Sequence, residues 1–185
     1  YVTGNNDLGE GAKSETAVGT TKARDLQDSS NYKLINTPNK KGQKVNHISA
    51  VNYVTNTINA SDIALVDYDY KTYWKSNSWD TGGYNNYNNG PTIILDKEYT
   101  IDRLEVTPKD DTASIFYAKI NYWDKNNEMK KITASVNRKT SPNGEVYYDI
   151  SFAKIKTSKI QINTANYTAS GNTVMREIRI FEYDS

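Results

Sequence analysis

The chain has 185 residues with 23 basic and 22 acidic side chains, so its formal net charge is +1. That length suits one domain, alone or with an appendage, and such a domain can close a hydrophobic core without staples. The absence of cysteine excludes disulfides, thiolate metal sites and cysteine nucleophiles. Because no basic stripe stands out and no apolar run approaches the roughly 20 residues of a membrane span, we expect neither nucleic acid nor membrane as a partner.

Residues 1–43 are rich in Gly, Ser, Thr, Asn, Lys and Asp and show little periodicity. This composition predicts an irregular leader or flanking segment, either draped over the main domain or linking it to a larger protein. We expect the folded module to occupy residues 44–185.

From Val45 onward, apolar side chains recur at every second position, which is the period of a half-buried strand. The alternating sets are Phe116, Ala118, Ile120 and Tyr122; Val146, Tyr148, Ile150 and Phe152; and the pairs Leu104 with Val106, Ile160 with Ile162, and Ile178 with Ile180. Turn-forming residues separate these sets, and no segment has a helical stripe. The pattern predicts an all-β protein, an antiparallel β-sandwich or barrel.

Two distant segments carry oxygen ligands. Asp67, Asp69 and Thr72 lie within six residues of one another, and hard oxygens so spaced suit calcium. An EF-hand would need Gly at its sixth position and Glu at its twelfth, where this chain has Thr72 and Ser78. On spacing alone, an ordinary turn with Asx-type hydrogen bonds remains open.

The order Asp67-Tyr-Asp69, then Thr72-Tyr-Trp74-Lys-Ser76, then a closing Glu177-Ile-Arg-Ile-Phe181 resembles the coagulation-factor type C, discoidin-like family. Bacterial members of that family include the family 32 carbohydrate-binding modules. Residues 90–96, 99–108 and 120–127 resemble its intervening strands, so the resemblance covers roughly residues 45–183. Tyr68 stands where the family usually has Gly, and Lys109 where it usually has Arg.

The resemblance implies a jelly-roll sandwich of the galactose-binding type that holds a structural Ca²⁺ ion. Asp67 and Glu177 would supply carboxylates, and Asp69 a side-chain or main-chain oxygen. Thr72 would supply its hydroxyl and carbonyl, and Ala64 and Arg176 their main-chain carbonyls. Acidic groups that converge without a cation repel one another, and a divalent ion removes that cost.

A sugar site combines an aromatic face with a few planar polar groups. The resemblance places this site on loops at one end of the sandwich. The candidates are Trp79, Tyr84, Tyr87, Lys109, Asp110, Asn166 and Tyr167. The alternative for each is a solvated loop residue or a ring that caps the core. We assign Trp74 and Trp123 to packing, and the single histidine, His47, to a surface or cap position.

We therefore expect a non-catalytic carbohydrate-binding module of a secreted or surface bacterial protein. It would be monomeric in isolation, would bind a host or cell-surface glycan, and would target an attached glycan-active enzyme or protease. An adhesion module for protein or phospholipid is the first alternative, and a spacer that binds nothing is another. Catalysis would be confined to a carboxylate pair, as in glycosidases, because the chain has one histidine and no cysteine.

Overall fold

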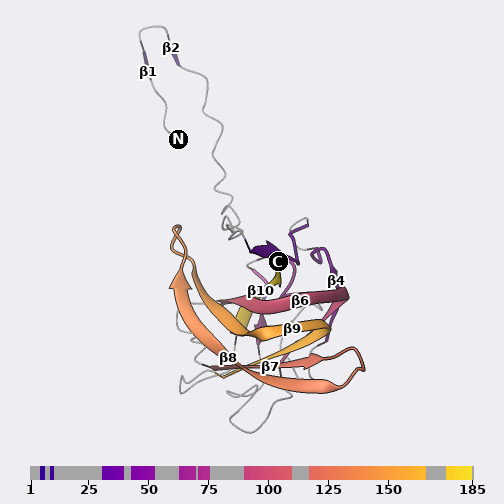
Figure 1. The fold of residues 1–185 in the computed structure, drawn as a ribbon. Coiled ribbons are helices and arrows are strands. Elements are labelled where there is room, and N and C mark those ends of the chain that lie inside the picture. Colours follow the sequence, from indigo (N-terminus) through magenta and orange to yellow (C-terminus); the bar gives the residue numbers. More distant parts are fainter. Residues whose placement is uncertain are drawn as a thin grey trace.

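The computed structural model describes residues 5–6, 9–10, 31–39, 43–52, 63–69, 71–75, 90–109, 117–165 and 174–184. Within these ranges every regular element is a β-strand (Figure 1), and no helix long and apolar enough to span a membrane occurs. The strands are β1 (Asn5–Asn6), β2 (Gly9–Glu10), β3 (Tyr32–Leu34), β4 (Ile48–Asn52), β5 (Trp74–Lys75), β6 (Thr92–Pro108), β7 (Tyr117–Trp123), β8 (Met129–Thr140), β9 (Val146–Ala165) and β10 (Val174–Tyr183).

The period of two locates the buried faces. Tyr148 and Ile150 of β9 are buried, as are Ala118 and Ile120 of β7, in agreement with the alternation in the sequence. Phe116 lies outside the described residues. Side chains on successive strand positions point to opposite faces, so each alternating set fixes which face meets the core. The prediction of an antiparallel β-sandwich is confirmed.

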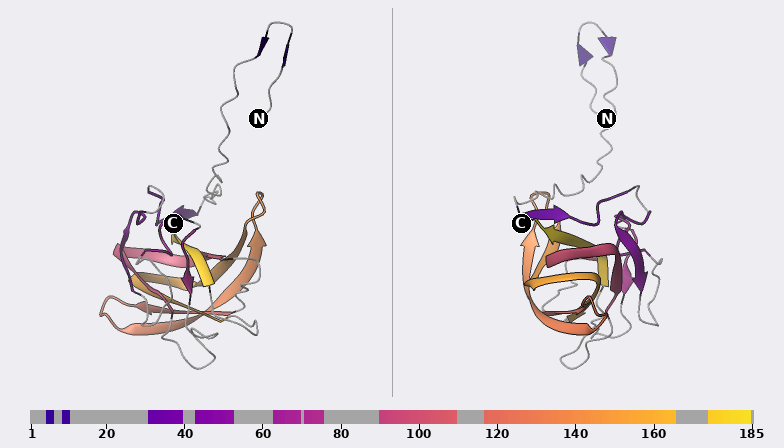
Figure 2. Two further views of the ribbon diagram at one scale, coloured as in Figure 1. Left: turned by 180° about the vertical axis from the view of Figure 1, so that it is seen from behind. Right: turned by 45° about the vertical axis from the view of Figure 1, so that its right-hand side comes forward.

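All strands from β3 to β10 belong to one antiparallel sheet, in the order β3-β10-β6-β9-β7-β8, with β4 beside β6 and β5 beside β10. The long strands β6 and β9 pair with each other at both ends, but their register shifts between Ile94 and Tyr99. Such an irregularity bends a sheet. The two strands thereby pass from one layer of the sandwich into the other, and β8 closes the far side by pairing with both β7 and β9. Figures 1 and 2 show the resulting curved body, from which the β8–β9 hairpin stands out.

One hydrophobic core lies between the layers. Isoleucine, leucine and valine from both halves of β6 and β9 pack with Ile120 of β7 and Ile178 of β10 in a single cluster. Trp74 is only 1% exposed and belongs to this cluster, which confirms its assignment to packing. The core is thus assembled mainly from residues far apart in the sequence.

The sheet begins before residue 44. Strand β3 pairs with the end of β10, and the following Ile35 is buried in the core. Asn36 is fully buried: its side-chain amide donates to the Ile178 carbonyl (2.6 Å), and its side-chain oxygen accepts from the Ile180 N–H (2.7 Å). Part of the segment that we expected to be a leader is therefore built into the sandwich.

Candidate functional site

A cluster of oxygens surrounds the Thr72 hydroxyl. Thr72 Oγ1 lies 2.9 and 3.0 Å from the two carboxylate oxygens of Asp67, 2.9 Å from the Asp69 carbonyl and 3.5 Å from the Ala64 carbonyl. A hydroxyl has one proton to donate, so it can satisfy only one of these four acceptors at a time. Several acceptor oxygens that face one another are better suited to a cation than to a hydrogen-bond network.

Glu177 joins this cluster from the other end of the chain. Its Oε2 accepts a hydrogen bond from the Tyr68 N–H (2.8 Å), although the two residues are 109 positions apart. Its Oε1 is buried and has no hydrogen-bond partner among the described residues. A buried carboxylate oxygen without a donor is costly unless a cation meets it.

The pKa shifts of Asp67 and Glu177 also favour a cation at this cluster. Burial raises the pKa of Asp67, and hydrogen bonds from the Asp69 N–H and Thr72 oppose the rise. Burial also raises the pKa of Glu177 well above its ordinary value, against the lowering effect of the Arg179 guanidinium. The charge of Asp67 raises the pKa of Glu177 further. Both anions are therefore unfavourable in the protein by itself, and a divalent ion would stabilise them.

The predicted cation ligands are largely brought together. Asp67, Thr72, Glu177 and the Ala64 carbonyl converge. The Asp69 carbonyl lies 2.9 Å from Thr72 Oγ1, and Asp69 Oδ1 accepts from the Lys71 N–H. The part of Arg176, which precedes Glu177 on β10, stays a prediction. Within the described ranges no three His, Cys, Asp or Glu side chains gather as a metal site, so a cation here would rely on main-chain and hydroxyl oxygens as well as two carboxylates. This donor set fits Ca²⁺, which accepts carbonyl and carboxylate oxygens in flexible geometry.

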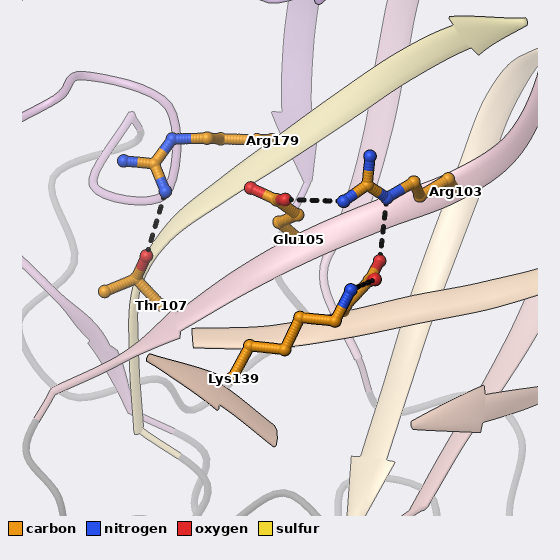
Figure 3. A network of polar contacts seen from close by, with 6 residues as sticks. Arg103, Glu105, Thr107, Lys139 and Arg179 are labelled. Atoms are coloured by element: carbon orange, nitrogen blue, oxygen red, sulfur yellow. Dashed lines mark hydrogen bonds and ion pairs between the residues drawn. The ribbon is translucent and has the colours of Figure 1, made fainter. Parts of the chain in front are cut away.

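Two further sets of polar contacts lie on neighbouring strands of the sheet (Figure 3), and Glu105, Asp149 and Arg179 among them are buried. Arg179 donates to the Thr107 hydroxyl (3.3 Å), while Arg103 pairs with Glu105 (3.0 Å) and Asp149 (2.8 Å). Lys139 of β8 contacts the second oxygen of Asp149. Opposite charges on neighbouring strands make it possible to bury this polar face.

Three segments that lie outside the described residues, 76–89, 110–116 and 166–173, are attached to the sandwich at neighbouring points. Lys75 and Val174 are paired across β5 and β10, and the Lys109 N–H donates to the Val174 carbonyl (3.2 Å). At the other ends of these segments, Tyr117 lies beside Ala165, and Gly90 lies beside Asn163, two residues earlier on β9. Tyr117 pairs with Ala165, and the Gly90 N–H donates to Asn163 Oδ1 (2.9 Å). Each of the three segments therefore connects the first group of neighbouring residues to the second.

Six of the seven predicted sugar-binding residues fall within these three segments. Trp79, Tyr84, Tyr87, Asp110, Asn166 and Tyr167 lie outside the described residues, so their positions stay predictions. Lys109 is described: its ammonium lies 4.3 Å from the centre of the Tyr73 ring. Trp123, at the opposite end of β7, is half-buried, pairs across strands with Met129 and carries Lys159 over its ring, in agreement with a packing role.

Sequence reasoning missed several residues of this region. Tyr68 adopts a left-handed backbone conformation (φ 50°) that is rare for a bulky side chain, and its hydroxyl donates to the Asn36 carbonyl (3.2 Å). The tyrosine at a position usually held by Gly was the only signal of this conformation. His47, also left-handed (φ 62°), contacts Asp96 (2.8 Å), which in turn accepts from Tyr99. Nothing in the local sequence links these three side chains.

No family model matches the sequence, and no curated protein sequence matches it. Solved structures do share its fold. A structure of the first two family 32 carbohydrate-binding modules of Clostridium perfringens ZmpB matches with a TM-score of 0.54 over 74% of this chain and 34% of that one, at 14% identity. The family 32 module of Streptococcus pneumoniae EndoD matches with a TM-score of 0.51 over 83% of this chain and 100% of the module, at 12% identity. The fold is that of a family 32 carbohydrate-binding module.

A third module of this kind, from a family 31 glycoside hydrolase of Clostridium perfringens, matches with a TM-score of 0.50 over 74% of this chain and 92% of the module, at 18% identity. This chain thus spans about a third of the first matched structure, which holds two modules, and nearly all of each isolated module. The family resemblance read from residues 67–76 and 177–181 is confirmed at the level of the fold.

Proposed function

We propose that this chain is a non-catalytic carbohydrate-binding module that binds glycan at the end of the sandwich where segments 76–89, 110–116 and 166–173 are attached. The observation that supports the proposal is the adjacency of Lys75, Val174 and Lys109, because these are the described residues next to the segments that contain Trp79, Tyr84, Tyr87 and Tyr167. Aromatic faces and amide groups at one end of a rigid scaffold are what sugar recognition needs.

Structures with the same fold support the ligand class. One is a complex of the ZmpB modules with GalNAc, and another is a complex of the AlyQ module with 4,5-unsaturated mannuronic acid. The fold alone does not fix the ligand. We propose that this module likewise serves a secreted or surface bacterial protein, as a monomeric unit that holds a glycan-active enzyme or protease near host or cell-surface sugars.

The second part of the proposal is a structural Ca²⁺ ion at the oxygen cluster. Asp67, Thr72 and Glu177 would hold it, with the Ala64, Asp69 and Arg176 carbonyls. The unpartnered Oε1 of Glu177 supports this assignment, because a bound cation would meet that buried oxygen. When bound, the ion would neutralise the two carboxylates and tie the loop of residues 63–72 to β10.

A glycan array with the calcium-loaded chain tests the main proposal. We expect weak binding, with dissociation constants of about 1 µM to 1 mM, as one shallow site permits. Trp79→Ala and Tyr167→Ala should each abolish it. Met129→Ala is a suitable control, because Met129 is the one large apolar side chain exposed among the described residues. It lies at the start of β8, beside Trp123 at the end of β7 that is far from segment 110–116. Binding that survives both aromatic substitutions would place the site elsewhere, and no binding to any glycan would refute the proposal.

A further inference from the structure

The row of residues next to segments 76–89, 110–116 and 166–173 contains two lysines. Lys75 of β5 and Val174 of β10 are directly opposite in the antiparallel pairing, and Lys109 follows the end of β6 on the other side of Val174. Adjacent strands lie about 4.8 Å apart, so the Cα atoms of the two lysines are separated by about 10 Å. That distance is comparable to the length of a disaccharide.

The alternation of the strands places both lysines on one face. Trp74, Met175 and Pro108 form the preceding row and are buried against the core. The next row, with Lys75, Val174 and Lys109, therefore points away from the core, and each of its three residues is half-buried. The two ammonium groups stand on the outer face beside the predicted glycan site.

Tyr73 restricts one of these cations. Its ring lies 4.3 Å from the Lys109 ammonium, a cation–π contact that limits the rotamers of a long side chain. Tyr73 also follows Thr72 directly, so the same short segment supplies a cation ligand and a support for Lys109. A lysine held in this way loses less conformational entropy when it binds a ligand.

The charges of Lys75 and Lys109 are not matched by carboxylates in the described part of the chain. Lys130, Lys139 and Lys156 each have an acidic partner there, at Glu128, Asp149 and Glu98 respectively. Neither Lys75 nor Lys109 has one within the described ranges. An ammonium group is a compact point charge whose strongest partners are anionic oxygens, and two of them on one face, on either side of Val174, favour a ligand that carries negative charge.

From these contacts we infer that the module recognises an acidic glycan, one that carries carboxylate or sulfate groups, and that Lys75 and Lys109 bind its anionic groups while Tyr73 positions Lys109. This inference rests on the proposed glycan-binding function. Two ammonium groups select for negative charge but do not distinguish a carboxylate from a sulfate. The experiment therefore tests carboxylated and sulfated sugars separately.

The test compares short uronate oligosaccharides, sulfated oligosaccharides and neutral galacto-oligosaccharides by isothermal titration calorimetry, with the full chain and excess CaCl₂. At least one acidic series should bind in preference to the neutral one, and its affinity should fall as NaCl rises. Lys75→Gln and Lys109→Gln should each weaken binding about tenfold, a loss of about 1.4 kcal/mol. Tyr73→Leu should weaken binding, while Tyr73→Phe, which keeps the ring, should not.

Lys125→Gln is the matched control, because Lys125 is an exposed lysine in the turn between β7 and β8. The affinity of this variant for the acidic sugar should equal that of the parent chain. Thermal unfolding of every variant verifies that it is folded. Equal affinity for neutral and acidic sugars, or affinity unchanged in both lysine variants, would overturn the inference and leave the glycan-binding function standing. Failure to bind any sugar would overturn both, as would binding to phosphatidylserine vesicles in place of sugars.

Discussion

The substitution Glu177→Gln gives the sharpest test of the cation centre, because it removes one of two buried negative charges and keeps the shape of the side chain. The amide oxygen can still accept the Tyr68 N–H bond, so the packing of the loop on β10 is preserved. A ligand at 100 times its dissociation constant stabilises a folded protein by about 2.7 kcal/mol. For a chain of 150–250 residues, each kcal/mol shifts the midpoint by about 2–4 °C, so Ca²⁺ should raise Tm by about 5–11 °C in the parent chain.

The stability of Glu177→Gln relative to the parent should change sign between calcium-free and calcium-loaded conditions. With a chelator present, Glu177→Gln should be more stable than the parent by up to about 1–3 kcal/mol, since it no longer buries a charge that burial and Asp67 disfavour, and this gain exceeds the lost attraction to Arg179. With excess Ca²⁺ the order should reverse, because the variant has lost a charged ligand. Differential scanning calorimetry with EGTA and with CaCl₂ measures both effects, and Glu128→Gln, at an exposed hairpin position, is the control.

Two results would refute this reasoning. A parent chain whose Tm is the same with chelator and with millimolar Ca²⁺ would show that the oxygen cluster holds no such ion. An equal Ca²⁺-induced increase in the parent and in Glu177→Gln would show that an ion binds elsewhere.

Further predictions concern the scaffold. In Gly90→Ala the added Cβ would lie 1.8 Å from the Ile162 carbonyl oxygen, so urea unfolding should show a loss of about 1–3 kcal/mol or more; an unchanged midpoint would contradict this close approach. Asn36→Ala leaves two buried main-chain groups of β10 unpaired and should cost about 1–3 kcal/mol for each, with faster hydrogen exchange in β10; unaltered exchange would count against the bridge. Burial tends to raise the pKa of Asp149, but its bonds to Arg103 and to a lysine outweigh this and lower it. The ionised Asp149 therefore stabilises the fold above the ordinary carboxyl pKa, and this stability is lost as pH falls through the pKa of the folded state. Asp149→Asn should make the free energy of unfolding depend less on pH in the acid range. The same acid dependence in parent and variant would disprove this.

Much of the fold was predictable, for a local reason. The alternation around Ile120 and Ile150 reports which side of a strand meets the core, and it needs no knowledge of the strand's neighbours. The alternation does not report the bend that carries β6 and β9 between the layers. The sequence does interrupt the pattern there, because residues 90–96 and 99–108 were expected as separate strands; the structure joins them as β6, with a shift in its pairing with β9 between Ile94 and Tyr99.

In the candidate site, too, local features were predictable from the sequence and long-range contacts were not. Asp67, Asp69 and Thr72 lie close in sequence, so their oxygen-rich character was visible, yet a simple Asx turn explained them equally well. The Asx-type bond from the Asp69 N–H to Asp67 Oδ1 is present in the structure. Glu177 joins the same cluster through its contact with Tyr68, and a contact over 109 positions has no local signature. Tyr73 was similarly invisible, because its role depends on Lys109, which arrives from another strand.

By itself, the sequence determined the strand periods, the absence of thiol chemistry and the kinds of ligand atoms available, since these follow from residue type and nearest neighbours. Only the tertiary structure decided that Tyr32–Leu34 completes the sheet, that Glu177 faces Asp67, and that Lys75 and Lys109 flank Val174. Those arrangements depend on the register between distant strands. The register is set by how buried side chains from the whole chain pack together, and no short stretch of residues contains that information.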